Sequence, residues 1–225
     1  MTSQRAIVIG DVHGCADELR DLLVACAYTP RDSVVFVGDL VAKGPDSRGV
    51  LAICRELQAK AVMGNHDFAL VSYYRARKRG ENWPLRPGHW ALAQMFSDAE
   101  FEQLDALPLW LELPEHNALI VHGGFVPGVP LEKHDPKLLL NLRTLTPQGT
   151  GSTKATGGQL WATNYEGPPF VLFGHHALAG LQKHPWAVGL DTGCVYGKQL
   201  TACVLPERSL VSVPARKAYV QVASP

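Results

Sequence analysis

The stretch Ala6-Ile7-Val8-Ile9-Gly10-Asp11-Val12-His13-Gly14 decides the fold of this 225-residue chain. Its four leading apolar residues predict a short buried strand, and a glycine-flanked aspartate and histidine follow directly where that strand ends. In residues 17–28, apolar side chains recur at positions i, i+3, i+4 and i+7, which predicts an amphipathic helix. A buried strand, a polar loop and a helix in this order are typical of an α/β protein.

The same pattern occurs twice more along the chain. A second apolar run at 33–37 ends at Gly38-Asp39 and precedes a helix expected over 46–58. A third run at 60–63 ends at Gly64-Asn65-His66-Asp67 and leads into another helical stretch. Three such units indicate a sheet whose first half is parallel, with helices packed against it. Functional side chains are then expected outside the carboxyl ends of these strands.

The remainder of the chain divides into a helical segment and a strand-rich second half. Residues 75–105 predict helices with an irregular break, which we expect to form a small helical cap segment. Residues 127–168 are expected to be loop-like. The strands expected in the second half are 109–113, 118–121, 170–173, 187–190, 200–205 and 210–213. We therefore predict one domain, residues 1–225, carrying the cap segment as an insertion.

Composition restricts the classes of partner. Lys and Arg total 21, as do Asp and Glu, so no global field attracts nucleic acid or a membrane surface. The five cysteines are an odd number, lie far apart and form no Cys-x-x-Cys pair, which favours a reducing compartment. No apolar run approaches the roughly 18 residues of a spanning helix. We expect a cytoplasmic protein that attracts an anionic ligand only locally.

Five loop segments carry side chains of the types that bind metals. They are Asp11-x-His13, Asp39, Asn65-His66-Asp67, His122-Gly123-Gly124 and Gly174-His175-His176. Carboxylate, imidazole and amide ligands without cysteine favour Mn²⁺, Fe²⁺, Co²⁺, Ni²⁺ or Zn²⁺. Each segment alone is compatible with an ordinary turn or a hydrogen-bonded structural histidine. Because all five follow apolar runs, together they predict a divalent-metal site at one edge of the sheet.

These motifs resemble those of the calcineurin-like metallophosphoesterases. More closely, Gly-Asp-Leu-Val-Ala-Lys-Gly-Pro-Asp-Ser (38–47) and Gly-Leu-Asp-Thr-Gly-Cys-Val-Tyr-Gly (189–197) are similar to bacterial symmetrical diadenosine tetraphosphatases and ApaH-like phosphatases. The resemblance spans Ile7 to about Ala202. It implies an α/β fold with a central β-sandwich of two mixed sheets flanked by helices, and a small helical or loop cap.

The resemblance also implies two divalent metal ions, with Mn²⁺ the expected metal and Co²⁺, Fe²⁺, Ni²⁺ or Zn²⁺ as alternatives. The first would be held from the two strand-end loops nearest the N-terminus, and Asp39 would bridge both ions. The ligands implied by the resemblance are Asp11, His13, Asp39, Asn65, His122 and His175.

His66 would be the catalytic histidine by the same resemblance, together with the bridging Asp39. Ala42-Lys43 stands where the protein serine/threonine phosphatases have an Asp-Arg pair, so the usual partner that orients this histidine is missing. Asp67 is left as a candidate for that role. Asp191 is either an acceptor for a ligand histidine or a cap for the turn that follows it.

Lys43 and Arg143 are the expected contacts to phosphate oxygens, since the related phosphatases place an arginine from each of these regions on the phosphate. Lysine offers a point charge where arginine offers a bidentate fork, so Lys43 should discriminate less by shape.

The function expected is hydrolysis of a phosphoanhydride, specifically symmetrical cleavage of diadenosine tetraphosphate to two ADP. The partner would then be a small nucleotide polyphosphate, with no membrane or nucleic acid. The alternatives are a protein (Ser/Thr/Tyr) phosphatase acting on a phosphoprotein, or a polyphosphatase. A catalytically silent binding module would be expected to have lost ligands, and the ligand positions here are intact.

Overall fold

Strand β1 (Ala6–Ile9) is buried on both faces, as its unbroken apolar run predicts. In the computed structural model, which describes residues 4–221, Ala6 and Val8 pack between two sheets. Ile7 and Ile9 point to the opposite face, where helices cover them. The strand pairs in parallel with β2 (Ser33–Phe36) and antiparallel with β12 (Gln199–Leu205), so it lies in the middle of its sheet.

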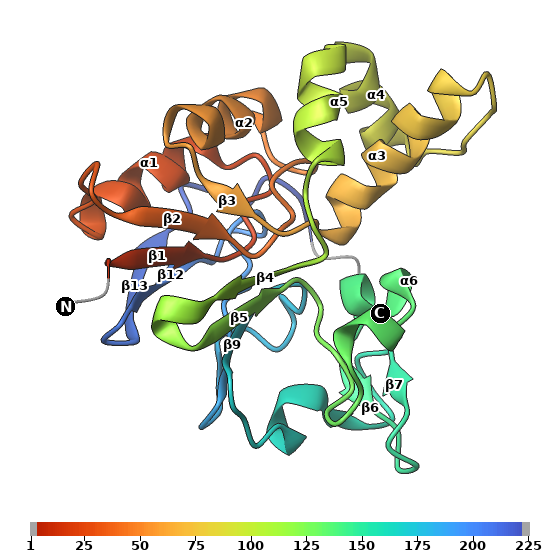
Figure 1. Cartoon of the computed structure of the whole chain (residues 1–225). Coiled ribbons are helices and arrows are strands. Elements are labelled where there is room, and N and C mark those ends of the chain that lie inside the picture. Colours follow the sequence, from red (N-terminus) through yellow and green to blue (C-terminus); the bar gives the residue numbers. More distant parts are fainter. Residues whose placement is uncertain (1–3, 222–225) are drawn as a thin grey trace.

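Two five-stranded mixed sheets form the centre of the molecule (Figure 1). The first has the order β13-β12-β1-β2-β3, where β3 is Lys60–Ala61 and β13 is Ser209–Pro214. The second has the order β10-β11-β9-β5-β4. Its strands are β4 (Trp110–Leu113), β5 (Ala118–Val121), β9 (Phe170–Phe173), β10 (Gln182–Lys183) and β11 (Ala187–Gly189). The predicted sandwich of two mixed sheets is thereby confirmed.

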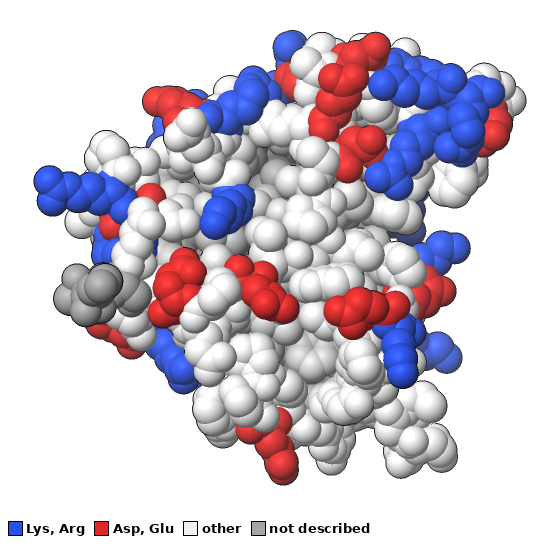
Figure 2. Space-filling view, in the orientation of Figure 1, with Lys and Arg blue, Asp and Glu red and all other residues white. Residues whose placement is uncertain are grey.

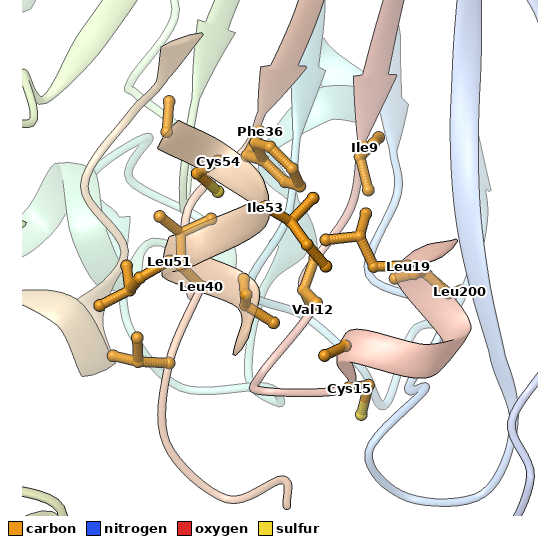
Figure 3. Close-up of a cluster of buried hydrophobic side chains, with 14 of the residues drawn as sticks. Ile9, Val12, Cys15, Leu19, Phe36, Leu40, Leu51, Ile53, Cys54 and Leu200 are labelled. Atoms are coloured by element: carbon orange, nitrogen blue, oxygen red, sulfur yellow. The ribbon is translucent and has the colours of Figure 1, made fainter. Parts of the chain in front are cut away.

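Two helices cover the outer face of the first sheet. They are α1 (Ala16–Ala25) and α2 (Ser47–Glu56), close to the predicted ranges. Figure 3 shows Leu19 of α1 and Ile53 of α2 turned toward Ile9 and Phe36 of the sheet. Asp46 caps α2, because its side chain accepts the backbone N–H of Gly49 at 2.8 Å.

Three further helices occupy the region around residues 75–105. They are α3 (Asn65–Lys78), α4 (Pro87–Met95) and α5 (Asp98–Asp105). The basic run at the end of α3 is neutralised by acidic side chains, and Figure 2 shows the two colours interleaved at the upper right. The pairs are Arg75–Asp105, Arg77–Asp98, Lys78–Glu102 and Arg79–Glu81. This run is therefore a paired surface, whereas the start of α4 turns toward the strand-end loops.

Residues 127–168 contain regular structure where the sequence predicts loops. A small sheet of order β7-β6-β8 joins β6 (Thr144–Leu145), β7 (Gly151–Ser152) and β8 (Gln159–Leu160), beside α6 (Pro136–Asn141). Strands of two residues are too short to carry a periodic signal. The segment is anchored by Trp161, which is buried with Phe125 and Phe173 on the outer face of the second sheet. Three short 3₁₀ turns complete the fold, at Pro114–His116, Leu131–Lys133 and Trp161–Asn164.

All five cysteines are buried and free, which agrees with the absence of a disulfide framework in the sequence. Within residues 4–221, none of the helices combines the length and the apolar character that crossing a membrane would require.

Candidate active site

The strand-end loops converge on the carboxylate of Asp39. This residue follows β2, and its Oδ2 lies 3.4 Å from Nε2 of His13 and 3.5 Å from Nε2 of His122. Its other oxygen, Oδ1, accepts the backbone N–H of His66 at 2.9 Å. Loops that follow β1, β2, β3 and β5 thus meet at one side chain, as the parallel order of the first strands predicts.

The amide oxygen of Asn65 is a second meeting point. Its Oδ1 lies 3.1 Å from Nε2 of His122 and 2.9 Å from Nδ1 of His175. Asp11 accepts the backbone N–H of His175 at 3.1 Å. Ligand atoms of Asp11, Asp39 and His122 lie within 4.8 Å of one another, as do those of His13, Asp39 and His66. Asp39 belongs to both of these clusters, and Asn65 and His175 join them through the contacts of Asn65 Oδ1, so the six predicted ligands lie in one connected set.

The backbone around the site adopts conformations that L-amino acids avoid. His13, Asp39, Ala42, Lys43 and His175 all have φ between 48° and 72°. Each non-glycine residue in this region costs on the order of 1–3 kcal/mol, and such residues concentrate at functional sites. The backbone of Gly64 also lies so close to that of Asp39 that a Cβ at position 64 would be 2.1 Å from the amide nitrogen of Asp39. The loops are held in strained positions that direct their side chains inward.

Burial dominates the electrostatics of the cluster. It raises the pKa of Asp11 well above its ordinary value, reinforced by Asp191 and Asp39, and it lowers the pKa of His13 to about 3. Burial also works to raise the pKa of Asp39, but His122, His66 and His13 outweigh it and hold that pKa below its usual range. The cluster gathers buried carboxylate, imidazole and amide groups, and Nε2 of His175 is buried without a partner among the described residues. Such a set fits divalent cations.

His66 lies in the first turn of α3, and its imidazole contacts two other histidines. Its Nδ1 lies 2.9 Å from Nε2 of His89, and its ring meets the ring of His13 edge-on at 5.0 Å. No role was predicted for His89, because its place in Arg-Pro-Gly-His at the start of a helix carries no periodic or motif signal.

Asp67 does not contact the His66 ring. Its carboxylate is fully buried and accepts the backbone N–H groups of Gly64 at 2.9 Å, Leu40 at 3.1 Å and Val41 at 3.3 Å. It therefore ties the start of α3 to the loop that carries Asp39. The structure therefore does not support Asp67 as the residue that orients the imidazole of His66.

Asp191 caps the turn after β11, since its Oδ1 accepts the N–H of Gly193 at 3.1 Å. Of its two predicted roles, the structure thus shows the turn cap. Ligand histidines are instead oriented by backbone carbonyls: Nδ1 of His122 lies 2.8 Å from the oxygen of Val37, and Nδ1 of His13 lies 3.3 Å from that of Val41.

A cavity of about 400 Å³ opens above the cluster, and four cationic side chains line it. Lys43 directs Nζ to within 3.0 Å of Nε2 of His13. Arg143 is anchored by a hydrogen bond from Nη1 to the carbonyl of Thr153, at 2.7 Å. Both residues predicted to contact phosphate therefore border the cavity, and Arg86 and Lys198, which the sequence did not single out, join them.

A second groove of about 530 Å³ continues from this cavity along α4. The two share Lys43, His66 and Arg86. Beyond these residues the groove becomes apolar, with Leu92 and Met95 on the α4 side. The side chain of Met95 is 60% exposed and therefore available to a ligand.

Comparison with known proteins gives consistent matches. Residues 4–204 match the family model described as calcineurin-like phosphoesterase. The chain is 29% identical over 238 residues to the asymmetrical bis(5'-nucleosyl)-tetraphosphatase PrpE of Oceanobacillus iheyensis, covering 95% of this chain and 93% of that protein. It is 39% identical over 127 residues to a symmetrical bis(5'-nucleosyl)-tetraphosphatase of Shewanella baltica, covering 55% of this chain and 46% of that one. A crystal structure described as a candidate diadenosine tetraphosphatase is 37% identical, with a TM-score of 0.86 over 95% of both chains.

Replacing Asp67 should destabilise the protein more than an ordinary helix cap. Asp67→Ala leaves three buried backbone N–H groups without their acceptor, so we expect the free energy of unfolding to fall by about 3 kcal/mol. Glu100→Ala is the comparison, because Glu100 is the third residue of α5 as Asp67 is of α3. Glu100 accepts one backbone N–H, together with the Ser97 hydroxyl and the partly exposed Arg48. The cost of Glu100→Ala should be about 1 kcal/mol. Urea unfolding of the metal-free proteins measures both, and equal losses would contradict the linking role of Asp67.

Proposed function

The chain belongs to the calcineurin-like phosphoesterase family, and we propose that it hydrolyses a phosphoanhydride bond of a dinucleoside tetraphosphate. The observation that carries the proposal is the continuity of three surfaces: the ligand cluster around Asp39, the cation-lined cavity above it and the apolar groove along α4. Together they offer places for metals, for a phosphate chain and for a nucleoside. Two proteins that match 95% of this chain are named or described as tetraphosphatases, which supports a dinucleoside tetraphosphate as the substrate.

Two divalent metal ions, with Mn²⁺ the preferred candidate, would be held by this connected set of ligands. Asp11 and His13 would serve one ion, Asn65, His122 and His175 the other, and Asp39 would serve both. A shared carboxylate is the simplest way for two like charges to be held about 4 Å apart. When bound, the ions supply a nucleophile at neutral pH and offset the charge on the phosphoryl oxygens. Lys43 and Arg143, on the cavity wall, would bind the remaining phosphate oxygens.

His66 would donate a proton from its ring to the leaving oxygen. Burial lowers the pKa of His66 to about 4, so the protonated imidazole is scarce at neutral pH. A nucleotide leaves a phosphoanhydride as a stabilised phosphate anion and needs little protonation, whereas a serine alkoxide needs much more. The environment of His66 therefore favours a phosphoanhydride over a phosphoserine, which places the protein phosphatase alternative second.

The names of the relatives that match along most of the chain support one position for the cleaved bond. Relatives that cover 95% of this chain are named asymmetrical, whereas two symmetrical relatives from Shewanella baltica strains each align with 55% of it. We therefore favour ATP and AMP as products. Cleavage to two ADP, predicted from the segments 38–47 and 189–197, is the alternative.

Product analysis tests the proposed function directly. We expect the purified chain with Mn²⁺ to convert diadenosine tetraphosphate to ATP and AMP, resolved by ion-exchange chromatography. Parallel reactions with long-chain polyphosphate and a phosphoserine peptide should be at least ~10-fold slower, because they lack a nucleoside for the groove. If the products are instead two ADP molecules, the cleaved bond is the one at the centre of the substrate. Intact dinucleotide beside rapid dephosphorylation of the peptide would overturn the proposal.

Asp39→Asn should remove both metals at once. The substitution weakens the one side chain that lies in both clusters, so we expect metal content to fall from about two equivalents to below one and activity to fall at least ~10²-fold. Asp98→Asn, an exposed carboxylate on α5, controls for the loss of a negative charge. Atomic absorption on dialysed protein gives the metal content. Two retained equivalents would show that Asp39 does not bridge.

Met95→Ala should weaken the binding of nucleotides only. Loss of an exposed apolar side chain from the groove is expected to raise KM for diadenosine tetraphosphate about fivefold, equivalent to ~1 kcal/mol of apolar contact. KM for p-nitrophenyl phosphate, which lacks a nucleoside, should stay unchanged. Val24→Ala, which truncates an exposed apolar residue on α1, is the control. An unchanged KM for the dinucleotide would place the nucleoside elsewhere.

A further inference from the structure

We propose that His89, carried by α4, positions the imidazole of His66 for proton donation. The inference rests on the proposed role of His66 as the acid, and it adds a residue to the site from outside the strand-end loops. His89 lies 23 positions beyond His66 in sequence, in a segment that contributes none of the ligands. It reaches the site because α4 packs beside the start of α3.

The two imidazoles meet edge to edge. Nδ1 of His66 and Nε2 of His89 are 2.9 Å apart, the ring centroids are 5.0 Å apart, and the ring planes differ by 11°. The ring planes are thus nearly parallel. The centroids lie farther apart than the two nitrogens, so the nitrogens face each other between the rings at hydrogen-bond distance.

This hydrogen bond fixes which nitrogen of His66 faces the substrate. Nδ1 of His66 keeps its proton and donates it to Nε2 of His89, so Nε2 of His66 is the atom left to carry the transferable proton. When that proton passes to the leaving oxygen, His66 becomes neutral with Nδ1–H still bonded to His89. The same hydrogen bond therefore holds before and after the transfer, and the ring does not have to turn. In a histidine pair, the partner's hydrogen bond sets the tautomer.

No carboxylate takes this role among the described residues 4–221. Position 42 is an alanine, and the Asp67 carboxylate is occupied by three backbone N–H groups. Asp39 meets His66 through the backbone N–H rather than the ring. His89 is thus the one side chain in this part of the chain that hydrogen-bonds the His66 imidazole.

Packing of α4 against α3 restricts the position of His89. His89 is 8% exposed, and Ala93, four residues on along the same face of α4, is 3% exposed. Pro87 fixes the first turn of the helix. Trp90 packs edge-on against Tyr73 of α3, with the ring centroids 5.7 Å apart. A partner fixed by a packed helix restricts the rotation of His66 more firmly than a loop residue would.

A double-mutant cycle separates positioning from general damage. With phenyl phosphate, a poor leaving group, His89→Ala should lower kcat about tenfold while KM and metal content stay unchanged. The loss should be smaller with p-nitrophenyl phosphate. In a His66→Ala background, His89→Ala should change kcat less than about twofold, because its effect acts through His66. His89→Gln, whose amide oxygen can accept from Nδ1–H, should recover most of the rate. An equal loss in both backgrounds would overturn the proposal.

The tautomer of His66 provides a readout that needs no turnover. In the zinc-loaded protein, nitrogen-15 shifts of the His66 ring should show a protonated Nδ1 in the wild type and in His89→Gln. In His89→Ala they should shift toward a mixture of tautomers. An unchanged Nδ1–H signal in His89→Ala would reject the positioning role even if diadenosine tetraphosphate proves not to be the substrate. Failure of the dinucleotide assay alone would count against the proposed function and leave this inference standing, because the phenyl phosphates and the spectra do not depend on it.

Discussion

The structure is organised around one buried carboxylate, that of Asp39. A buried anion is expensive unless surrounding groups stabilise it, and here two imidazoles and a backbone N–H do so from three different loops. To bring those loops together, the chain places β1, β2 and β3 side by side in parallel and packs a second sheet behind them. It also accepts left-handed backbone at five non-glycine positions. Bound divalent cations would relieve the remaining imbalance, so the stability of these loops and the chemistry of the site are linked.

Much of this arrangement follows from local sequence. Apolar runs of four residues, each followed by glycine and a ligand-type side chain, determine both the strand and the point where its loop leaves the sheet. The parallel strands, helices α1 and α2 and the convergence of the strand-end loops are therefore readable from pattern, whereas the sandwich of two mixed sheets was implied by the family resemblance. The cytoplasmic location and the single domain over residues 1–225 stay predictions.

The features that could not be predicted from the sequence depend on tertiary contacts. The strands β6, β7 and β8 have two residues each, and their sheet exists because Trp161 is buried beneath it. His89 acquires a role only when α4 packs against α3, and no spacing in the sequence links it to His66. Asp67 shows the converse case: it is adjacent to His66 in sequence, yet its side chain points back to the Asp39 loop. Proximity along the chain thus proved a weaker guide than the direction in which a helix presents its side chains.

The placement of α4 has an evolutionary consequence. The predicted metal ligands follow strands that pair in the two sheets. Arg86, His89 and Met95 instead belong to the helical segment 75–105, which makes none of the sheet pairings. Changes in that segment can alter proton delivery and nucleoside fit together while the ligand geometry persists. Proteins with this architecture can therefore change substrate through substitutions in a single helix. Exchanging α4 between relatives would transfer the preference for a leaving group together with that helix.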